Sequence, residues 1–275
     1  MSDAERSIAG RPFSGAMTSA EAAAIDAGLR GHMLRIYNYM VLGLAITGLA
    51  AFGVYALSVT GDVAAAAKIS RDGIDIPFRL AGLNMYYTPL GYTMFVGPLK
   101  WPIILAPLGL VFALGSSIER MRPRTAQLLF WLYAALFGLS LGSIFMIYTQ
   151  TSVVRVFFIT AAAFGALSLW GYTTQRDLTG VGSFLIMGLL GVVIAGAVNL
   201  FLASSALQWT ISVIGVLVFS GLTAWHTQRL KNEYIYFAMD GATAQRSAVI
   251  GALSLYLDFV NMFTMLLQLL GERED

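Results

Sequence analysis

The amino-acid sequence predicts an all-α membrane protein with seven transmembrane helices. Of its 275 residues, 57% are hydrophobic and only 12% are charged, whereas soluble domains carry about 25% charged residues. The mean hydropathy is +0.72. Several apolar runs approach or exceed the ~18 residues that mark a membrane-spanning helix. A helical bundle in a lipid bilayer is therefore the expected fold class.

Seven apolar runs define the predicted spans. They occupy residues 37–59, 101–118, 126–148, 153–170, 181–202, 207–226 and 248–270. Most of them are separated by short polar breaks of the kind that form turns, such as "TQTS" at 149–152 and "ASSA" at 203–206. The spans are therefore expected to follow one another as helical hairpins.

The residues before the first span are polar and mixed in charge. Residues 1–35 lack the short apolar core and small-residue cleavage site of a signal peptide. We expect a polar cytoplasmic segment at 1–35, followed by a first span that serves as an uncleaved anchor.

One long break, at 60–100, separates the first and second spans and includes "NMYYTPLGYTMFVGPLK". We expect it to be a non-cytoplasmic insertion within a transmembrane domain that covers residues 36–271. A short charged tail at 272–275 follows that domain. The second span, 101–118, contains no acidic residue.

Small residues recur at helical spacing in the third and fifth spans. They are Gly138 and Gly142 in the third, and Gly188, Gly191 and Gly196 in the fifth. Such positions let helix backbones approach closely in lipid, which explains them without a cofactor. "GVGSFLIMG" follows no predicted strand, so it does not indicate a nucleotide-binding loop.

The distribution of Lys and Arg indicates the orientation. With the N-terminus inside, the inner connections and flanks contain Arg30, Arg35, Arg120, Arg122, Arg124, Arg176, Arg229, Lys231 and Arg246. The outer side then has Arg155 and Arg273 in its short segments. A cytoplasmic N-terminus follows. Seven spans would place "GERED" outside, unless the last segment is re-entrant.

Composition also excludes several classes of function. The chain has no cysteine, which rules out disulfides, thiolate metal sites and cysteine nucleophiles. It has two histidines and no "HExxH", and no pattern of a serine nucleophile activated by a base is evident. An intramembrane hydrolase, and enzyme activity in general, is therefore not expected. Basic flanks are expected from membrane topology alone, so they do not indicate nucleic acid as a partner.

A carboxylate lies near the middle of the last span, in "ALSLYLDFVNMFTMLLQLLG" at 252–271. An Asp at that depth costs about 2.5–3.5 kcal/mol on insertion scales, so Asp258 should face protein or water. Ser254, Asp258 and Asn261 are spaced i, i+4, i+7 and share one helical face. The stripe is either a structural hydrogen-bond network or a site that titrates or contacts ions.

The sixth span offers partners for this carboxylate. It contains Ser212, Ser220, Thr223 and His226, of which the last three are expected on one face near the cytoplasmic end. His226 is the best candidate for a contact, although an interfacial histidine that reaches water is equally compatible with the sequence. His32 precedes the first span and is expected to be solvated.

Three tracts resemble the Bax inhibitor-1 family of membrane proteins. They are "TTQRDLTGVGSFLIMGLLGVVIAGAVNLF" at 173–201, "FSGLTAWHTQRLK" at 219–231 and the last span quoted above. The resemblance extends from residue 30 onward and implies seven helices, six of them surrounding a central C-terminal helix, in a bacterial inner membrane.

The resemblance also implies a mechanism. Several members are credited with a pH-sensitive calcium leak, controlled by a proton-sharing pair of aspartates in the sixth and seventh helices. Asp258 falls on the seventh-helix position, but His226 occupies the sixth-helix position. Two adjacent carboxylates cannot both ionise cheaply, whereas a His and Asp pair has no like-charge state.

Two functions are carried forward. The first is a pH-sensitive leak or channel for calcium or another cation, with no bound cofactor beyond transient calcium, gated around Asp258 and His226. Its polar path would include Asn261, Ser254, Ser220, Thr223 and Asn199. The alternative is a non-conducting regulator of other membrane proteins, since some bacterial relatives are linked to modulation of a membrane-bound ATP-dependent protease. The expected partners are the lipid bilayer, cations and other membrane proteins.

Overall fold

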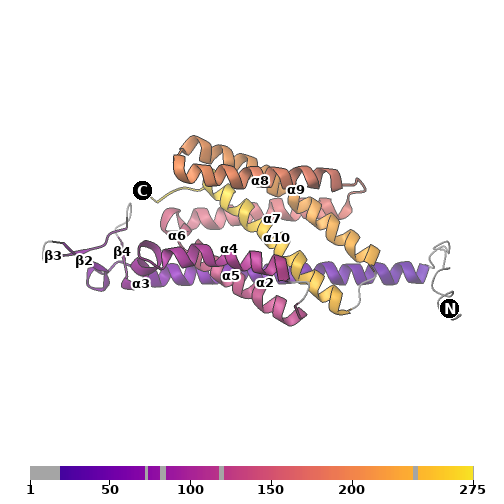
Figure 1. The fold of residues 1–275 in the computed structure, drawn as a ribbon, viewed down its shortest axis with the longest axis horizontal. Helices are drawn as coiled ribbons and strands as arrows, with labels where there is room; N and C mark the ends of the chain where they lie inside the picture. Colours follow the sequence, from indigo (N-terminus) through magenta and orange to yellow (C-terminus); the bar gives the residue numbers. More distant parts are fainter. Residues whose placement is uncertain (1–18, 72–73, 81–84, 118–120, 238–240, 275) are drawn as a thin grey trace.

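The computed structural model describes residues 19–71, 74–80, 85–117, 121–237 and 241–274, and nearly all of them are helical (Figure 1). The helices are α2 Ser19–Ser58, η1 Val63–Ala65, α3 Pro89–Gly91, η2 Tyr92–Val96, α4 Lys100–Ser117, α5 Pro123–Leu141, α6 Ile144–Ile147, α7 Gln150–Thr173, α8 Thr179–Leu202, α9 Ser205–Phe237 and α10 Gly241–Leu270. Six helical segments of the described chain are long and apolar enough to cross a membrane. The predicted all-α membrane class is confirmed.

A further candidate span is bent. The segments Pro89–Val96 and Lys100–Gly115 are long and apolar enough to cross a membrane only when they are taken together, and they meet at an angle of 58°. This region contains the predicted second span, 101–118. Pro107 lies inside α4, where its missing N–H removes one backbone hydrogen bond.

Two helices extend well beyond the predicted spans. Helix α2 begins at Ser19, so part of the polar segment predicted at 1–35 is helical; residues 1–18 lie outside the described residues. Helix α9 continues past His226 to Phe237. The two extensions contact each other, since a Cβ on Gly28 would lie 2.3 Å from the hydroxyl of Tyr234. Apolar runs mark the part of a helix in lipid, not where the helix ends.

Close helix contacts explain the glycines of the third predicted span. A Cβ on Gly138 would lie 2.5 Å from the carbonyl oxygen of Thr47, and one on Gly142 would lie 2.3 Å from Cγ1 of Val54. Helix α5 therefore approaches α2 closely, as small residues permit. The helix is interrupted between α5 and α6, around Gly142, inside the predicted span 126–148.

The glycines of α8 divide into two groups. A Cβ on Gly188 would lie 3.2 Å from Val218 of α9, whereas no heavy atom of a neighbouring element lies within 4 Å of the Cβ positions of Gly191 and Gly196. The packing explanation is thus correct for Gly188 and wrong for the other two, because Gly191 lies on an exposed face of α8 and Gly196 lines a cavity between α8, α9 and α10.

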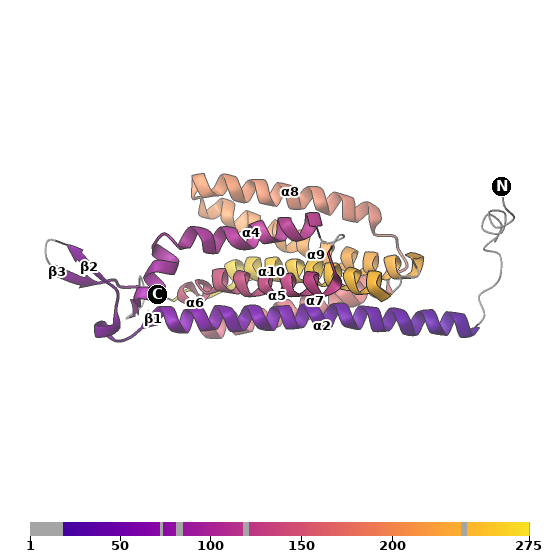
Figure 2. The ribbon, with the colours of Figure 1, turned by 60° about the horizontal axis from the view of Figure 1, so that its bottom comes forward.

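The strands of the described chain lie within the 60–100 insertion, except that β1 begins one residue before it. They are β1 Val59–Thr60, β2 Lys68–Arg71, β3 Ile74–Pro77 and β4 Tyr86–Tyr87. Strand β1 pairs antiparallel with β4, and β2 pairs antiparallel with β3. The insertion extends from the end of the bundle that holds the end of α10, and α2 begins at the opposite end (Figures 1 and 2).

Helix α10 is the most buried of the candidate spans. Of the residues in its most apolar stretch, 61% are buried inside the protein, compared with 17% to 39% for the other five long helices. It packs against α2, α5, α7 and α9, while α4 packs mainly on α5 and α8 mainly on α9. Tyr256 of α10 is fully buried, and its hydroxyl lies 2.6 Å from that of Thr47.

His32 is buried between α2 and α9, contrary to the solvated position expected from sequence. Its exposed fraction is 4%, and its ring stacks on Tyr234 with centroids 5.0 Å apart. Neither ring nitrogen has a hydrogen-bond partner among the described residues. The extension of both helices beyond the apolar runs is what covers this side chain.

The substitution His32→Phe is expected to stabilise the protein by about 1 kcal/mol. The larger ring keeps the stacking on Tyr234 and removes two buried polar atoms, which are unfavourable when unpaired. His32→Ala should destabilise it, because the ring contact is lost. Thermal unfolding in one detergent would be compared for the three proteins. A lower melting temperature for His32→Phe would mean that the imidazole nitrogens are hydrogen-bonded after all.

Candidate functional site

Asp258 and His226 form a contact between α10 and α9. The distance between Oδ2 of Asp258 and Nδ1 of His226 is 2.7 Å. The carboxylate side chain is 3% exposed and the imidazole 20% exposed. The polar face predicted from the i, i+4, i+7 spacing therefore points toward α9, and the predicted contact with His226 is present.

The pair lines a cavity of about 480 Å³ between α8, α9 and α10. Ser254, Asp258 and Asn261 of α10 and His226 of α9 contribute its polar side chains. Helix α8 contributes only apolar side chains and Gly196. The cavity thus has a polar wall that carries the ionisable pair, opposite an apolar wall.

The other two residues of the polar stripe bond within their own helix. Ser254 Oγ donates to the carbonyl oxygen of Ile250 at 3.1 Å, and Asn261 Nδ2 donates to that of Leu257 at 2.8 Å. Asn261 keeps its side-chain oxygen as an acceptor. Of the three α10 residues, Asp258 makes the contact that crosses to α9.

Three predicted site residues do not lie beside Asp258 in the structure. Thr223 is buried, and its hydroxyl donates to the carbonyl oxygen of Phe219 at 2.8 Å. Ser220 Oγ lies 3.4 Å from the sulfur of Met262. Asn199 lies near the end of α8, where its Oδ1 accepts from the backbone N–H of Ser204 at 3.0 Å. Neither Ser220, Thr223 nor Asn199 lines the cavity.

A polar network that the sequence interpretation missed lies near the C-terminal end of α10. Gln268 Oε1 accepts from Gln208 Nε2 at 2.6 Å and from Ser212 Oγ at 2.7 Å. Asn199 Nδ2 in turn donates to Gln208 Oε1 at 3.0 Å. Gln268 follows Asn261 by seven residues, so the same helical spacing could have identified it. The polar stripe therefore continues beyond the cavity.

Polar contacts also join α9 to the turn before α8. Gln228 Nε2 donates to the carbonyl oxygen of Arg176 at 2.7 Å, and Gln228 Oε1 accepts from the N–H of Leu178 at 2.8 Å. Asp177 is solvated, and its Oδ1 accepts from the N–H and hydroxyl of Thr179 at 2.9 and 2.6 Å. These hydrogen bonds hold the pKa of Asp177 below its ordinary value.

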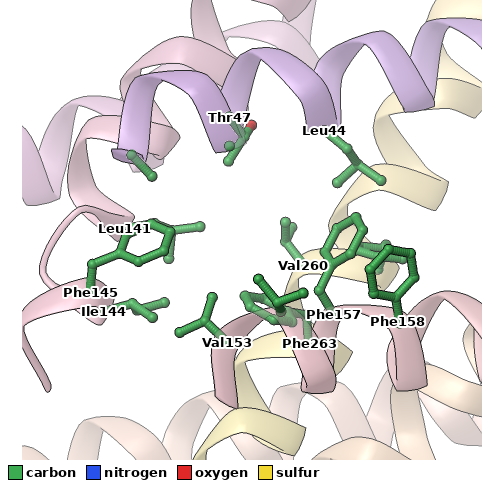
Figure 3. A pocket seen from close by; sticks show the side chains of 14 residues that line it. Leu44, Thr47, Leu141, Ile144, Phe145, Val153, Phe157, Phe158, Val260 and Phe263 are labelled. Atoms are coloured by element: carbon green, nitrogen blue, oxygen red, sulfur yellow. The ribbon is translucent and has the colours of Figure 1, made fainter. Parts of the chain in front are cut away.

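A second cavity, of about 280 Å³, lies between α2, α5, α6, α7 and α10. Leu44 and Thr47 of α2 face Phe157 and Phe158 of α7 across it (Figure 3). Its lining is apolar except for Thr47, whose hydroxyl is bonded to Tyr256. With no ionisable side chain, it is a poor candidate for an ion pathway. The candidate site is the cavity at Asp258.

The described residues contain no group of three or more His, Asp or Glu side chains that could hold a metal ion. A cation in the cavity would meet one carboxylate, one imidazole and the neutral oxygens of Ser254 and Asn261. Calcium prefers six to eight oxygen ligands. This set suits brief occupancy by a hydrated cation better than tight binding.

Comparison with known proteins gives consistent matches over most of the chain. A family model described as "Inhibitor of apoptosis-promoting Bax1" matches residues 29–275. The "Uncharacterized protein RP147" of Rickettsia prowazekii is 42% identical over 94% of this chain and 96% of its own length. The "Inner membrane protein YbhL" of Escherichia coli is 40% identical over 90% of this chain and 94% of its own.

Proposed function

The chain belongs to the Bax inhibitor-1 family of multi-pass membrane proteins, and we propose that it is a non-enzymatic, pH-sensitive cation leak. The observation that carries this proposal is the His226–Asp258 pair, with its 2.7 Å contact, on the wall of a cavity of about 480 Å³. Ionisable groups at membrane depth mark ion or proton pathways more often than structural contacts.

The topology in this proposal has seven crossings, with α10 as the central helix. The bent pair Pro89–Val96 and Lys100–Gly115 counts as one crossing. An odd number of crossings accords with the start of α2 and the end of α10 at opposite ends of the bundle (Figure 2). The N-terminus is cytoplasmic, because basic residues such as Arg30, Arg176 and Lys231 gather in the flanks at that end.

The net charge of the pair provides the pH dependence. With one proton to share, His226 and Asp258 carry no net charge; without it, they carry one net negative charge. A buried net charge is unfavourable unless a counter-ion accompanies it. Loss of the proton therefore favours entry of a cation into the cavity, and the polar stripe toward Gln268 offers oxygen atoms along the way.

Flux measurements in reconstituted vesicles test this function. Wild-type protein is expected to pass calcium and monovalent cations, with flux that increases as the pH is raised and the pair loses its proton. Vesicles without protein provide the background. Wild-type flux that equals this background at every pH would contradict the proposal.

That negative result would favour the alternative function, a non-conducting regulator of other membrane proteins. The insertion supports this alternative, because its β2–β3 hairpin extends beyond the bundle at the end that holds the C-terminus (Figure 1). Ile76 in this hairpin is 49% exposed. An apolar side chain on a projecting hairpin offers a surface for another protein, such as a membrane-bound ATP-dependent protease.

A further inference from the structure

A groove of about 580 Å³ lies between α2 and α7. Both helices pack against α10, but they make no extensive contact with each other within the described residues. The volume falls within the range of about 300–1,000 Å³ that is usual for ligand sites. The groove is separate from the cavity at Asp258, which α8, α9 and α10 enclose.

The walls of the groove are apolar and open to the bilayer. Met33 and Met40 of α2 face Phe164 of α7 among the lining residues. At its rim, Leu34 is 55% exposed and Leu169 is 64% exposed. In a membrane-spanning bundle, these exposed leucines contact lipid, so an acyl chain can reach the groove from the side without crossing water.

The polar hydroxyl groups along the walls are already hydrogen-bonded to other side chains of the protein. The hydroxyls of Tyr37 and Ser168 are hydrogen-bonded to each other, and Ser168 also contacts the hydroxyl of Thr227 at 2.9 Å. A polar solute would therefore find few partners along the groove. A hydrocarbon chain needs none.

Two cations lie near the end of the groove that is closest to the start of α2. Arg30 lines it, is exposed and has no ion pair among the described residues. Lys231 donates to the carbonyl oxygen of the lining residue Tyr172 at 2.8 Å. Guanidinium groups bind phosphate oxygens through charge-assisted hydrogen bonds, and basic pockets between membrane helices bind anionic headgroups.

We propose that this groove binds an anionic phospholipid, with one acyl chain between α2 and α7 and the headgroup phosphate at Arg30. The apolar walls account for the chain, the exposed rim for lateral entry from the bilayer, and Arg30 with Lys231 for the preference for negative charge. The bound chain fills the gap that α2 and α7 leave beside α10.

Native mass spectrometry of protein released from nanodiscs tests the headgroup. The nanodiscs contain equal amounts of phosphatidylglycerol and phosphatidylcholine, and wild-type protein is expected to retain phosphatidylglycerol preferentially. Arg30→Gln should lower this preference about tenfold, as loss of one charge-assisted hydrogen bond predicts. Arg35→Gln is the matched control, because Arg35 is also exposed on α2 but does not line the groove.

A second pair of variants tests the groove itself. Gly165 lines it, and no heavy atom of a neighbouring element lies within 4 Å of its Cβ position, so Gly165→Trp should fill the space and displace both lipids. Gly109→Trp on α4, also in open space, is the control and should retain lipid. Three results would overturn the proposal: no lipid on the wild type, equal losses in the two arginine variants, or undiminished lipid on Gly165→Trp.

Discussion

Replacing Asp258 with Asn is expected to reduce cation flux at least about tenfold, the effect of roughly 1.4 kcal/mol on a barrier. The amide has nearly the same shape as the carboxylate but cannot ionise. In the variant, the pair with His226 is therefore neutral or positive at every pH, and the state that attracts a cation is lost. Rates of calcium and monovalent-ion flux would be compared with the wild type in the same lipid.

Asp177→Asn is the matched control for this experiment. Asp177 is solvated in the turn before α8, and its hydrogen bonds to Thr179 keep its pKa low, so it is already charged at neutral pH. The Asn side chain retains an oxygen that can accept from the Thr179 N–H. Flux should stay close to the wild-type value. Equal losses in the two variants would argue against a special role for Asp258.

The contact at the centre of the site could be predicted because helical spacing orients side chains reliably over short distances. Ser254, Asp258 and Asn261 stay within about 60° of one another around the helix axis, given 3.6 residues per turn. Burial of a carboxylate in lipid then requires that this face meet protein. His226 was therefore the best candidate partner, and the structure places its Nδ1 2.7 Å from Oδ2 of Asp258.

The same geometry explains where the prediction for α9 was wrong. Ser220, Thr223 and His226 are three residues apart, and each such step rotates the side chain by about 60°. Ser220 is therefore turned about 120° from His226, and it contacts Met262 rather than the cavity. Asn199 belongs to another end of the bundle, a fact that depends on how α8 and α9 are joined and not on spacing within one helix.

Hydropathy located the helices but not their full extent. It measures which residues prefer lipid, so it could not show that α2 begins at Ser19 or that α9 ends at Phe237. The burial of His32 depends on both extensions and was missed for this reason. The strands of the insertion could not be predicted either, because strands as short as Val59–Thr60 show too little alternation of apolar and polar residues.

The substitution His226→Asp is expected to make the pH response of the flux steeper than in the wild type. Two carboxylates at this distance titrate as a unit, and loss of their shared proton leaves two like charges that repel each other. Over the same step the wild-type pair goes from no net charge to a single negative charge, so it has no such repulsion. A higher pH should therefore open the Asp variant more abruptly and raise its cation flux by a larger factor.

The substitution His226→Asn completes the series by removing the imidazole while keeping a polar side chain of similar size. Asp258 then lacks the partner that can share a proton with it, so the flux should depend less steeply on pH. Calcium and monovalent-ion flux would be recorded for the three proteins across one pH series. A steeper curve for Asp and a flatter one for Asn would assign the pH response to the contact between α9 and α10. Superimposable curves would instead make His226 an interfacial residue, and the response would have to come from another group.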